Sequence, residues 1–205
     1  VTGVQTCALP ISGLSSNQVG QLTTSQFVQL TSGQIRAIET ADIAGVSTNQ
    51  VAAIVTSQVA GLTTSQIAAL SSNQVGQLTT AAFAQLTSTQ LQSIETADIA
   101  GVTTSQIAGL SSNQVGQFLT AQLAQFSSNQ IQAIETGDVR GLTSSQIAGL
   151  SSNQVGQLTT SQFVQLTSGQ IRAIETADIA GVSTSQVAAI VTSDRKSTRL
   201  NSSHS

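Results

Sequence analysis

Aliphatic side chains recur along this chain in a strict eight-residue pattern. Residues 14–189 divide into 22 octads without an insertion or a deletion, as in LTTSQIAA at residues 62–69. Position one is always Leu, Ile, Val or Phe, position three is always Ser or Thr, and position six is always Val, Ile, Leu or Phe. A fixed period of this kind is the signature of a repeat architecture, in which neighbouring repeats stack on one another.

Neither one continuous helix nor one continuous strand accommodates this period. At about 100° per residue, eight residues advance a helix face by roughly 80°, so the apolar positions would wind around the whole helix. Position six lies five residues after position one, and an odd interval places two residues on opposite faces of a strand. The period therefore requires an element that restarts in every octad.

A short helix in each octad satisfies this requirement. In residues 62–69, Thr63 is a suitable N-cap and Gln66 is the third helical residue, which is the S/T-x-x-E/Q capping box. Leu62 before the cap and Ile67 at the fourth helical position form the matching hydrophobic staple. We therefore predict an all-α solenoid of short helices, six to seven residues each and one per octad. Positions one and six should face inward, and Ser, Thr and Gln should face outward.

Two other architectures stay open at this point. The content of Val, Ile and Thr is compatible with a β-solenoid. Enrichment in Ser, Gln and Gly is typical of a disordered low-complexity chain, although strict aliphatic spacing argues against disorder.

Six octads lack a good N-cap at position two. They carry Glu39, Val55, Glu95, Leu119, Glu135 and Glu175 there. We expect the Ser or Thr at position three to cap these helices instead. Glycine at position seven or eight, as in Gly45 and Gly101, is expected to end the helix.

A longer order lies over the octads. The octad LSSNQVGQ begins at Leu14, Leu70, Leu110 and Leu150, which are spaced by 56, 40 and 40 residues. Because this spacing is uneven, we interpret the longer order as history rather than geometry. Residues 14–56 and 150–192 differ only where Asn49 is replaced by Ser185, which indicates a recent duplication or an error in assembling sequence reads.

The two ends differ from the array in composition. One choice of codons for residues 1–11, read on the opposite strand, encodes DRKSTRLNSSH, which is the sequence of residues 194–204. We interpret residues 1–11 and 194–205 as translated sequencing adapter and expect them to be unstructured. The array proper is then residues 12–193, and motifs at the ends, such as Asn201-Ser202-Ser203, carry no function.

Composition excludes several classes of function. The array has eight acidic residues and only three basic ones, Arg36, Arg140 and Arg172, so its formal net charge is −5. Nucleic-acid binding needs clusters of Lys and Arg, so we expect no nucleic-acid partner. No run of about 18 apolar residues is present, so we expect no membrane insertion.

The array also lacks the residues that catalysis needs. It contains no His, Lys or Cys to activate its many hydroxyls, so we predict no enzyme activity, no catalytic residue and no cofactor. Its sharpest local feature is four acidic pairs, Glu39/Asp42, Glu95/Asp98, Glu135/Asp138 and Glu175/Asp178. We interpret them as helix-start carboxylates with the arginines as local partners, and we assign no metal site because calcium takes six to eight oxygens. The alternative is a ligand-binding module, with a weak Ca²⁺ site at these pairs or a Thr-rich face that orders water or ice.

The octad L-[ST]-[ST]-x-Q-[IV]-x-x resembles short repeats of very large bacterial surface and secreted proteins, often described as adhesin-like or haemagglutinin-like. This resemblance implies a non-enzymatic structural spacer or surface-interaction segment of a larger exported protein. It also implies an extracellular or cell-surface location, and a protein or cell-surface partner. The opening of each octad is also similar to the first helix of transcription-activator-like effector repeats, which supports local helix only.

Overall fold

The computed structural model describes residues 13–190, and these residues contain short helices and no strand. Two compact units meet in sequence between Val102 and Thr103. The fold-class prediction is confirmed for the described residues, and the β-solenoid alternative is wrong there. The proposed adapter segments, residues 1–11 and 194–205, lie outside the described residues.

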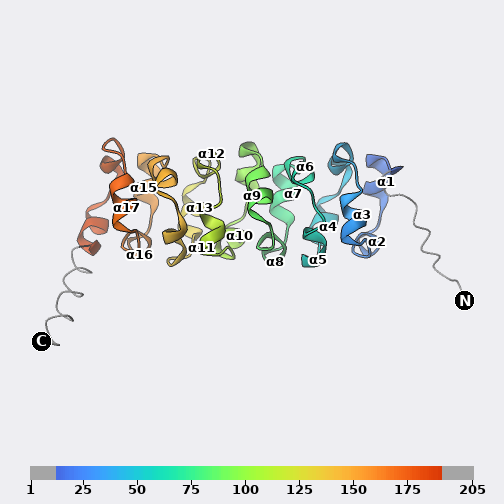
Figure 1. Cartoon of the computed structure of the whole chain (residues 1–205), viewed down its shortest axis with the longest axis horizontal. Coiled ribbons are helices and arrows are strands. Elements are labelled where there is room, and N and C mark those ends of the chain that lie inside the picture. The colour runs from blue at the N-terminus through green and yellow to red at the C-terminus, as the bar shows by residue number, and fades with distance from the viewer. Residues whose placement is uncertain (1–12, 191–205) are drawn as a thin grey trace, which may run out of the picture. The chain divides into compact units, whose positions relative to one another are not determined.

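The first unit contains nine short α-helices and two 3₁₀-helices among its described residues (Figure 1). They are α1 (Ser16–Gln21), α2 (Thr24–Phe27), α3 (Ser32–Arg36), η2 (Thr40–Gly45), α4 (Thr48–Ala52), α5 (Thr56–Val59), α6 (Thr64–Ala68), α7 (Ser72–Gln77), α8 (Thr80–Phe83), α9 (Ser88–Ser93) and η3 (Thr96–Gly101).

The second unit repeats this plan. Its helices are α10 (Thr104–Ala108), α11 (Ser112–Val115), α12 (Thr120–Leu123), α13 (Ser128–Ala133), η4 (Asp138–Gly141), α14 (Ser144–Ala148), α15 (Ser152–Gln157), α16 (Thr160–Phe163), α17 (Ser168–Ala173) and η5 (Asp178–Gly181). Residues 184–190 are also helical.

Most of these helices are shorter than the six to seven residues that we predicted, and six of the α-helices reach six residues. The α-helices from α1 to α17 have four to six residues and begin at position three of their octads. Such helices are unstable alone, since nucleation is unfavourable and only tertiary packing makes up for it. Their ends must therefore be capped and their sides must be packed.

The predicted capping box is present. In α6, the Oγ1 atom of Thr63 accepts a hydrogen bond from the backbone N–H of Gln66 at 3.1 Å. The Oε1 atom of Gln66 accepts from the backbone N–H of Thr63 at 2.9 Å. The box therefore satisfies two backbone donors that a helix start would otherwise leave without partners.

The two octads with Val or Leu at position two keep their caps at that position. Val55 and Leu119 stay at the N-cap, and their backbone N–H groups donate to Gln58 Oε1 at 3.0 Å and to Gln122 Oε1 at 2.8 Å. The expected transfer of the cap to position three is therefore wrong. The glutamine half of the box suffices in these two octads.

The octads with glutamate at position two form 3₁₀-helices instead of α-helices. In η2 and η3 the N-caps are Glu39 and Glu95, and neither side chain makes a capping hydrogen bond. Here too the hydroxyl at position three does not take over. In η4 and η5 the helix begins only at Asp138 and Asp178.

Within each unit, a helix packs on the helix three octads further along the chain. In the first unit α1 contacts η2, α4 contacts α7 and α6 contacts α9, and in the second unit α11 contacts η4 and α14 contacts α17. Each unit is therefore a superhelix of short helices that takes between three and four octads to complete a turn.

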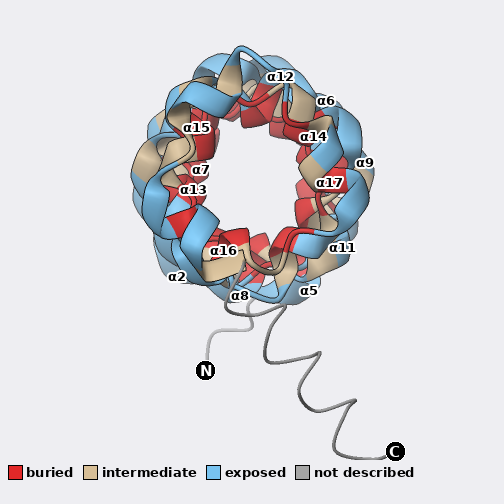
Figure 2. Ribbon diagram, turned by 90° about the vertical axis from the view of Figure 1, so that its left-hand side faces the viewer, coloured by how far each residue is buried: buried red, intermediate tan, exposed pale blue. Residues whose placement is uncertain are grey.

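The core of each unit consists of positions one and six, as predicted. Leu62 and Ile67 are buried in the first unit, and Leu142 and Ile147 are buried in the second. Figure 2 shows the buried residues on the inner side of the ribbon and the exposed residues on the outer side. Burial of these aliphatic side chains supplies the main stabilising term for helices this short.

Candidate functional site

From the fifth octad on, most glutamines at position five are buried, which contradicts our prediction that they face outward. Thirteen of them are between 0% and 6% exposed. The residues are Gln50, Gln58, Gln66, Gln74, Gln90, Gln106, Gln122, Gln130, Gln146, Gln154, Gln162, Gln170 and Gln186. A buried amide is costly unless it is fully hydrogen-bonded.

Gln66 shows how such an amide bridges two turns of the superhelix. The Nε2 atom of Gln66 donates to the carbonyl of Ile35 at 2.8 Å and to the carbonyl of Ile38 at 2.7 Å. The acceptors precede the glutamine by 31 and 28 residues. Because Oε1 of the same amide caps its own helix, one side chain both starts a helix and fastens it to the turn before.

The same two separations recur throughout both units. They are found at Gln50, Gln58, Gln74, Gln90, Gln146, Gln154, Gln162, Gln170 and Gln186. No buried side-chain nitrogen or oxygen lacks a partner in the part of the chain that the structure describes. We call this set of side chains the glutamine ladder.

A signal for the ladder is present in the sequence. A capping box accepts Glu as readily as Gln at its third helical position. None of the 22 octads has Glu at position five. Glutamate would supply the capping oxygen but not the amide donor, so its absence indicates that the –NH₂ group is also used.

The longer order of octads has a geometric part that our interpretation did not include. Every LSSNQVGQ octad is followed, three octads later, by an acidic octad that begins with Ile38, Ile94, Ile134 or Ile174. These are the pairs that pack together as α1 with η2, α7 with η3, α11 with η4 and α15 with η5. Although the spacing between successive pairs varies, the offset within a pair is constant.

A close backbone approach explains the glycines in these pairs. A Cβ atom at Gly101 would overlap the carbonyl of Ser72, and one at Gly45 would overlap the carbonyl of Ser16. No glycine in the described residues has a positive φ, so these glycines do not end helices through a left-handed conformation. They are required because the two backbones touch.

A polar contact reinforces the first of these pairs. The Oγ atom of Ser16 donates to Oδ1 of Asp42 at 2.7 Å, across 26 residues of sequence. Asp42 lies in the first turn of η2, where a carboxylate also interacts favourably with the helix dipole. The helix-start interpretation of this carboxylate is therefore supported.

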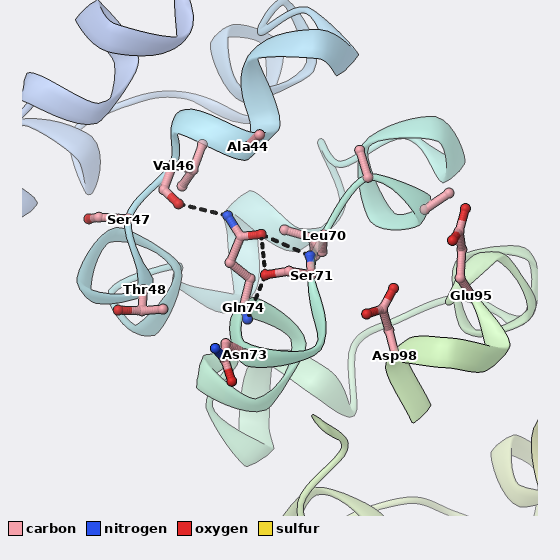
Figure 3. Close-up of a pocket in the computed structure, with 12 residues that line it drawn as sticks. Ala44, Val46, Ser47, Thr48, Leu70, Ser71, Asn73, Gln74, Glu95 and Asp98 are labelled. Carbon is pink, nitrogen blue, oxygen red and sulfur yellow. Dashed lines mark hydrogen bonds between the residues drawn. The ribbon is translucent and has the colours of Figure 1, made fainter. Parts of the chain in front are cut away.

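The acidic pair Glu95/Asp98 in the first unit lines an open cavity of about 510 Å³ (Figure 3). Glu95 and Asp98 lie on one side of it and Gln74 lies on another. Gln74 is already used, because its amide donates to Val46 at 2.7 Å and accepts from Ser71 at 2.8 Å. No group of three or more His, Cys, Asp or Glu side chains suited to a metal ion occurs in residues 13–190. The calcium site therefore stays a prediction, and it would have only two carboxylates, Glu95 and Asp98, as ligands.

The arginines do not pair with the acidic residues as we predicted. Arg140 donates through Nε to the backbone carbonyl of Gln165 at 3.1 Å. No ion pair joins an arginine to a carboxylate within the described part of the chain. Arg140 therefore links neighbouring turns in the second unit, in the same way as the glutamine ladder but from the surface.

The threonines at position two of the octads are used in capping, which bears on the water-ordering alternative. The hydroxyls of Thr63, Thr103, Thr143 and Thr159 each accept from a backbone N–H three residues later. These hydroxyl oxygens are engaged with the backbone, and the Thr-rich face stays a prediction.

Stacked short helices that repeat the same cap, the same core positions and the same amide bridge define a solenoid repeat protein. The family model of the ALTTAQ repeat matches residues 35–72, 91–128 and 131–168, which together are more than half of the chain. The chain therefore belongs to the ALTTAQ repeat family. No curated protein and no solved structure matches it. In the described residues, no helix has the length and apolar character that crossing a membrane requires.

Proposed function

We propose that this chain is a non-enzymatic structural spacer or surface-interaction segment of a larger, exported bacterial protein. The glutamine ladder carries this proposal. A spacer has to hold its shape under load, and a buried amide that donates to two carbonyls at the C-terminal end of the facing helix fixes each turn on the one before.

The chemistry of the array supports a passive role. The polar groups that are buried are glutamine amides, and they are consumed in capping and bridging. The array carries no His, Lys or Cys, so its hydroxyls have no neighbouring base to activate them. The outer surface presents Ser, Thr and Asn at recurring positions, which suits weak, repeated polar contacts with a protein or cell-surface partner.

Export is supported by the resemblance of the octad to repeats of bacterial surface and secreted proteins. The absence of cysteine from residues 14–189 is compatible with an oxidising environment, because no thiol is present to be oxidised.

Small-angle X-ray scattering on the whole chain tests the spacer role. A compact domain of 205 residues has a radius of gyration of about 17 Å, and a spacer must exceed it clearly. Single-molecule stretching supplies the second readout. Because each octad contacts its neighbours in sequence and octads about one turn away, we expect unfolding in several small steps. A radius near 17 Å together with one large cooperative step would contradict the proposal.

A further inference from the structure

Two helices that pack on each other in the first unit, α5 and α8, each lack one half of the capping box (Figure 1). Helix α5 begins after Val55, which has no side-chain oxygen, so only its backbone N–H is capped, by Gln58 Oε1 at 3.0 Å. Helix α8 begins after Thr79, whose hydroxyl accepts from the backbone N–H of Ala82 at 3.1 Å. Ala82 stands where the glutamine would be, so it offers no oxygen to the N–H of Thr79. Two incompletely capped helices therefore meet at one contact between turns.

The same contact lacks an amide bridge. The octads before and after octad nine are bridged to the preceding turn through Gln74 and Gln90. The carbonyls 31 and 28 residues before position 82 belong to Val51 and Ile54, and Ala82 has no side-chain donor for them. Because Val51, Ile54 and Ala82 are all buried, the loss of this donor costs free energy that the bridged octads do not lose.

A close backbone approach does not replace the amide in octad nine. The acidic octad of the same unit has Asp98 in place of glutamine, but there Gly101 lies directly against the backbone of Ser72. Octad nine has Ala84 and Gln85 at positions seven and eight, so it has no glycine that would allow such an approach. From the fifth octad to the eleventh, octad nine is therefore the one with neither a glutamine at position five nor a glycine of this kind.

The repeat plan does not impose an alanine at this place. The octads that follow LSSNQVGQ begin at residues 22, 78, 118 and 158, and only the one at 78 lacks glutamine at position five. In the second unit Gln162 occupies this place, and its Nε2 atom donates to the carbonyls of Ile131 at 2.9 Å and Ile134 at 2.7 Å. The first unit therefore lacks a bridge that the second unit has at the corresponding place.

We propose that the contact between α5 and α8 is a built-in opening point, at which the turns of the first unit separate first. The stability of a solenoid is approximately a sum over repeats and their nearest-neighbour contacts, so the contact with the fewest bonds opens at the lowest free energy. Octads six and nine open locally while the bridged octads around them stay closed. The use of this opening, a small first extension of a spacer under load, rests on the proposed function.

Hydrogen–deuterium exchange of the full chain, followed by mass spectrometry, tests this inference. After correction for intrinsic exchange rates, the helical amides of residues 54–61 and 78–85 should exchange at least about tenfold faster than those of residues 62–69 and 86–93. The two reference octads are bridged through Gln66 and Gln90 and belong to the same unit. All four octads differ in sequence, so their peptides can be told apart.

Two substitutions supply the missing groups one at a time. Val55→Thr gives α5 its capping hydroxyl and should slow exchange of residues 54–61 and 78–85 about fivefold. Leu119→Thr is the matched control, because it adds the same hydroxyl to α12 in the second unit and should leave both octads unchanged. Ala82→Gln supplies the amide and should slow exchange about fivefold, whereas Ala81→Gln, on the exposed side of α8, should not.

Equal protection of the four octads in the wild-type chain would overturn the inference. So would a Val55→Thr variant that slows exchange of residues 54–61 and 78–85 no more than Leu119→Thr does. Exchange is measured without load, so equal protection would remove the opening point and leave the spacer proposal intact. A compact chain in the scattering experiment would remove the spacer role and leave the local opening in place.

Discussion

The Nε2 atom of Gln66 lies 2.7 Å from the carbonyl oxygen of Ile38, which precedes it by 28 residues. This bond joins a side chain that starts one helix to the backbone at the end of another. Because the relationship recurs in both units, the stability of the array depends on the amide at position five as much as on its aliphatic core.

Replacing Gln66 with alanine should lower the free energy of unfolding by about 2–4 kcal/mol, because two buried carbonyls and one N-cap N–H lose their partner. Gln26→Ala is the control, since Gln26 is exposed and only caps its helix, and it should cost about 1 kcal/mol or less. Urea denaturation followed by circular dichroism measures both. Equal losses in the two variants would show that the ladder adds nothing to capping.

Replacing Gln66 with glutamate should make stability depend on pH. Burial among carbonyl oxygens raises the pKa of the introduced carboxyl above its unfolded value of about 4.3. The protonated acid can donate one hydrogen bond, so the variant should be most stable below about pH 4.3 and should lose stability as pH rises through the raised pKa.

Urea midpoints of Gln66→Glu, measured between about pH 4 and pH 8 and referred to wild type, check the direction of this dependence. Gln26→Glu is the control, because its carboxyl would stay in water and its deficit should hardly change over the same range. A deficit at Gln66→Glu that shrinks as pH rises would contradict the ladder geometry.

Gly101→Ala should destabilise the first unit by about 1–3 kcal/mol, because the new methyl group overlaps the backbone of Ser72. Gly33→Ala lies in helix α3 of the same unit and meets only the hydroxyl of Thr31, at 3.9 Å. That substitution should stabilise by about 0.5–1 kcal/mol, because alanine favours helix over glycine. The melting temperatures of the two variants should therefore shift in opposite directions. A shift of the same sign in both would show that close backbone packing is not what requires glycine at position 101.

Ala82→Gln should extend the ladder. Ala82 occupies position five and is fully buried, and the residues 31 and 28 before it are Val51 and Ile54. A glutamine amide there should donate to the carbonyls of Val51 and Ile54, and its oxygen should accept from the backbone N–H of Thr79. These bonds should raise the free energy of unfolding by about 1 kcal/mol. Ala81→Gln is the control, because Ala81 is exposed in the same helix and should change stability little. If Ala82→Gln destabilises the protein while Ala81→Gln does not, the core around Ala82 has no room for the larger side chain.

The local part of this fold could be predicted from the sequence. Helix starts, capping boxes and inward aliphatic positions are set by residues within one octad, such as Thr63, Gln66 and Ile67. The interactions behind these patterns join residues that are close in sequence, so the sequence alone is enough to predict them.

The relation between turns was harder to predict, because it depends on the number of octads that complete a turn. The capping role of Gln66 is compatible with a position on the surface, and its second role depends on a carbonyl 31 residues away. The packing of Gly101 on Ser72 was missed for the same reason, although the constant offset between LSSNQVGQ and the acidic octads was visible in the sequence.

The glutamine ladder also constrains how a gene for such an array can change. The amides of the ladder donate to carbonyls that lie a fixed number of residues earlier in the chain. The loss of a single codon would therefore shift the acceptors away from every amide whose bridge spans the deletion. Unequal crossing-over that adds or removes whole multiples of eight codons keeps the count. Natural variation in these arrays should therefore consist of length differences in steps of eight residues.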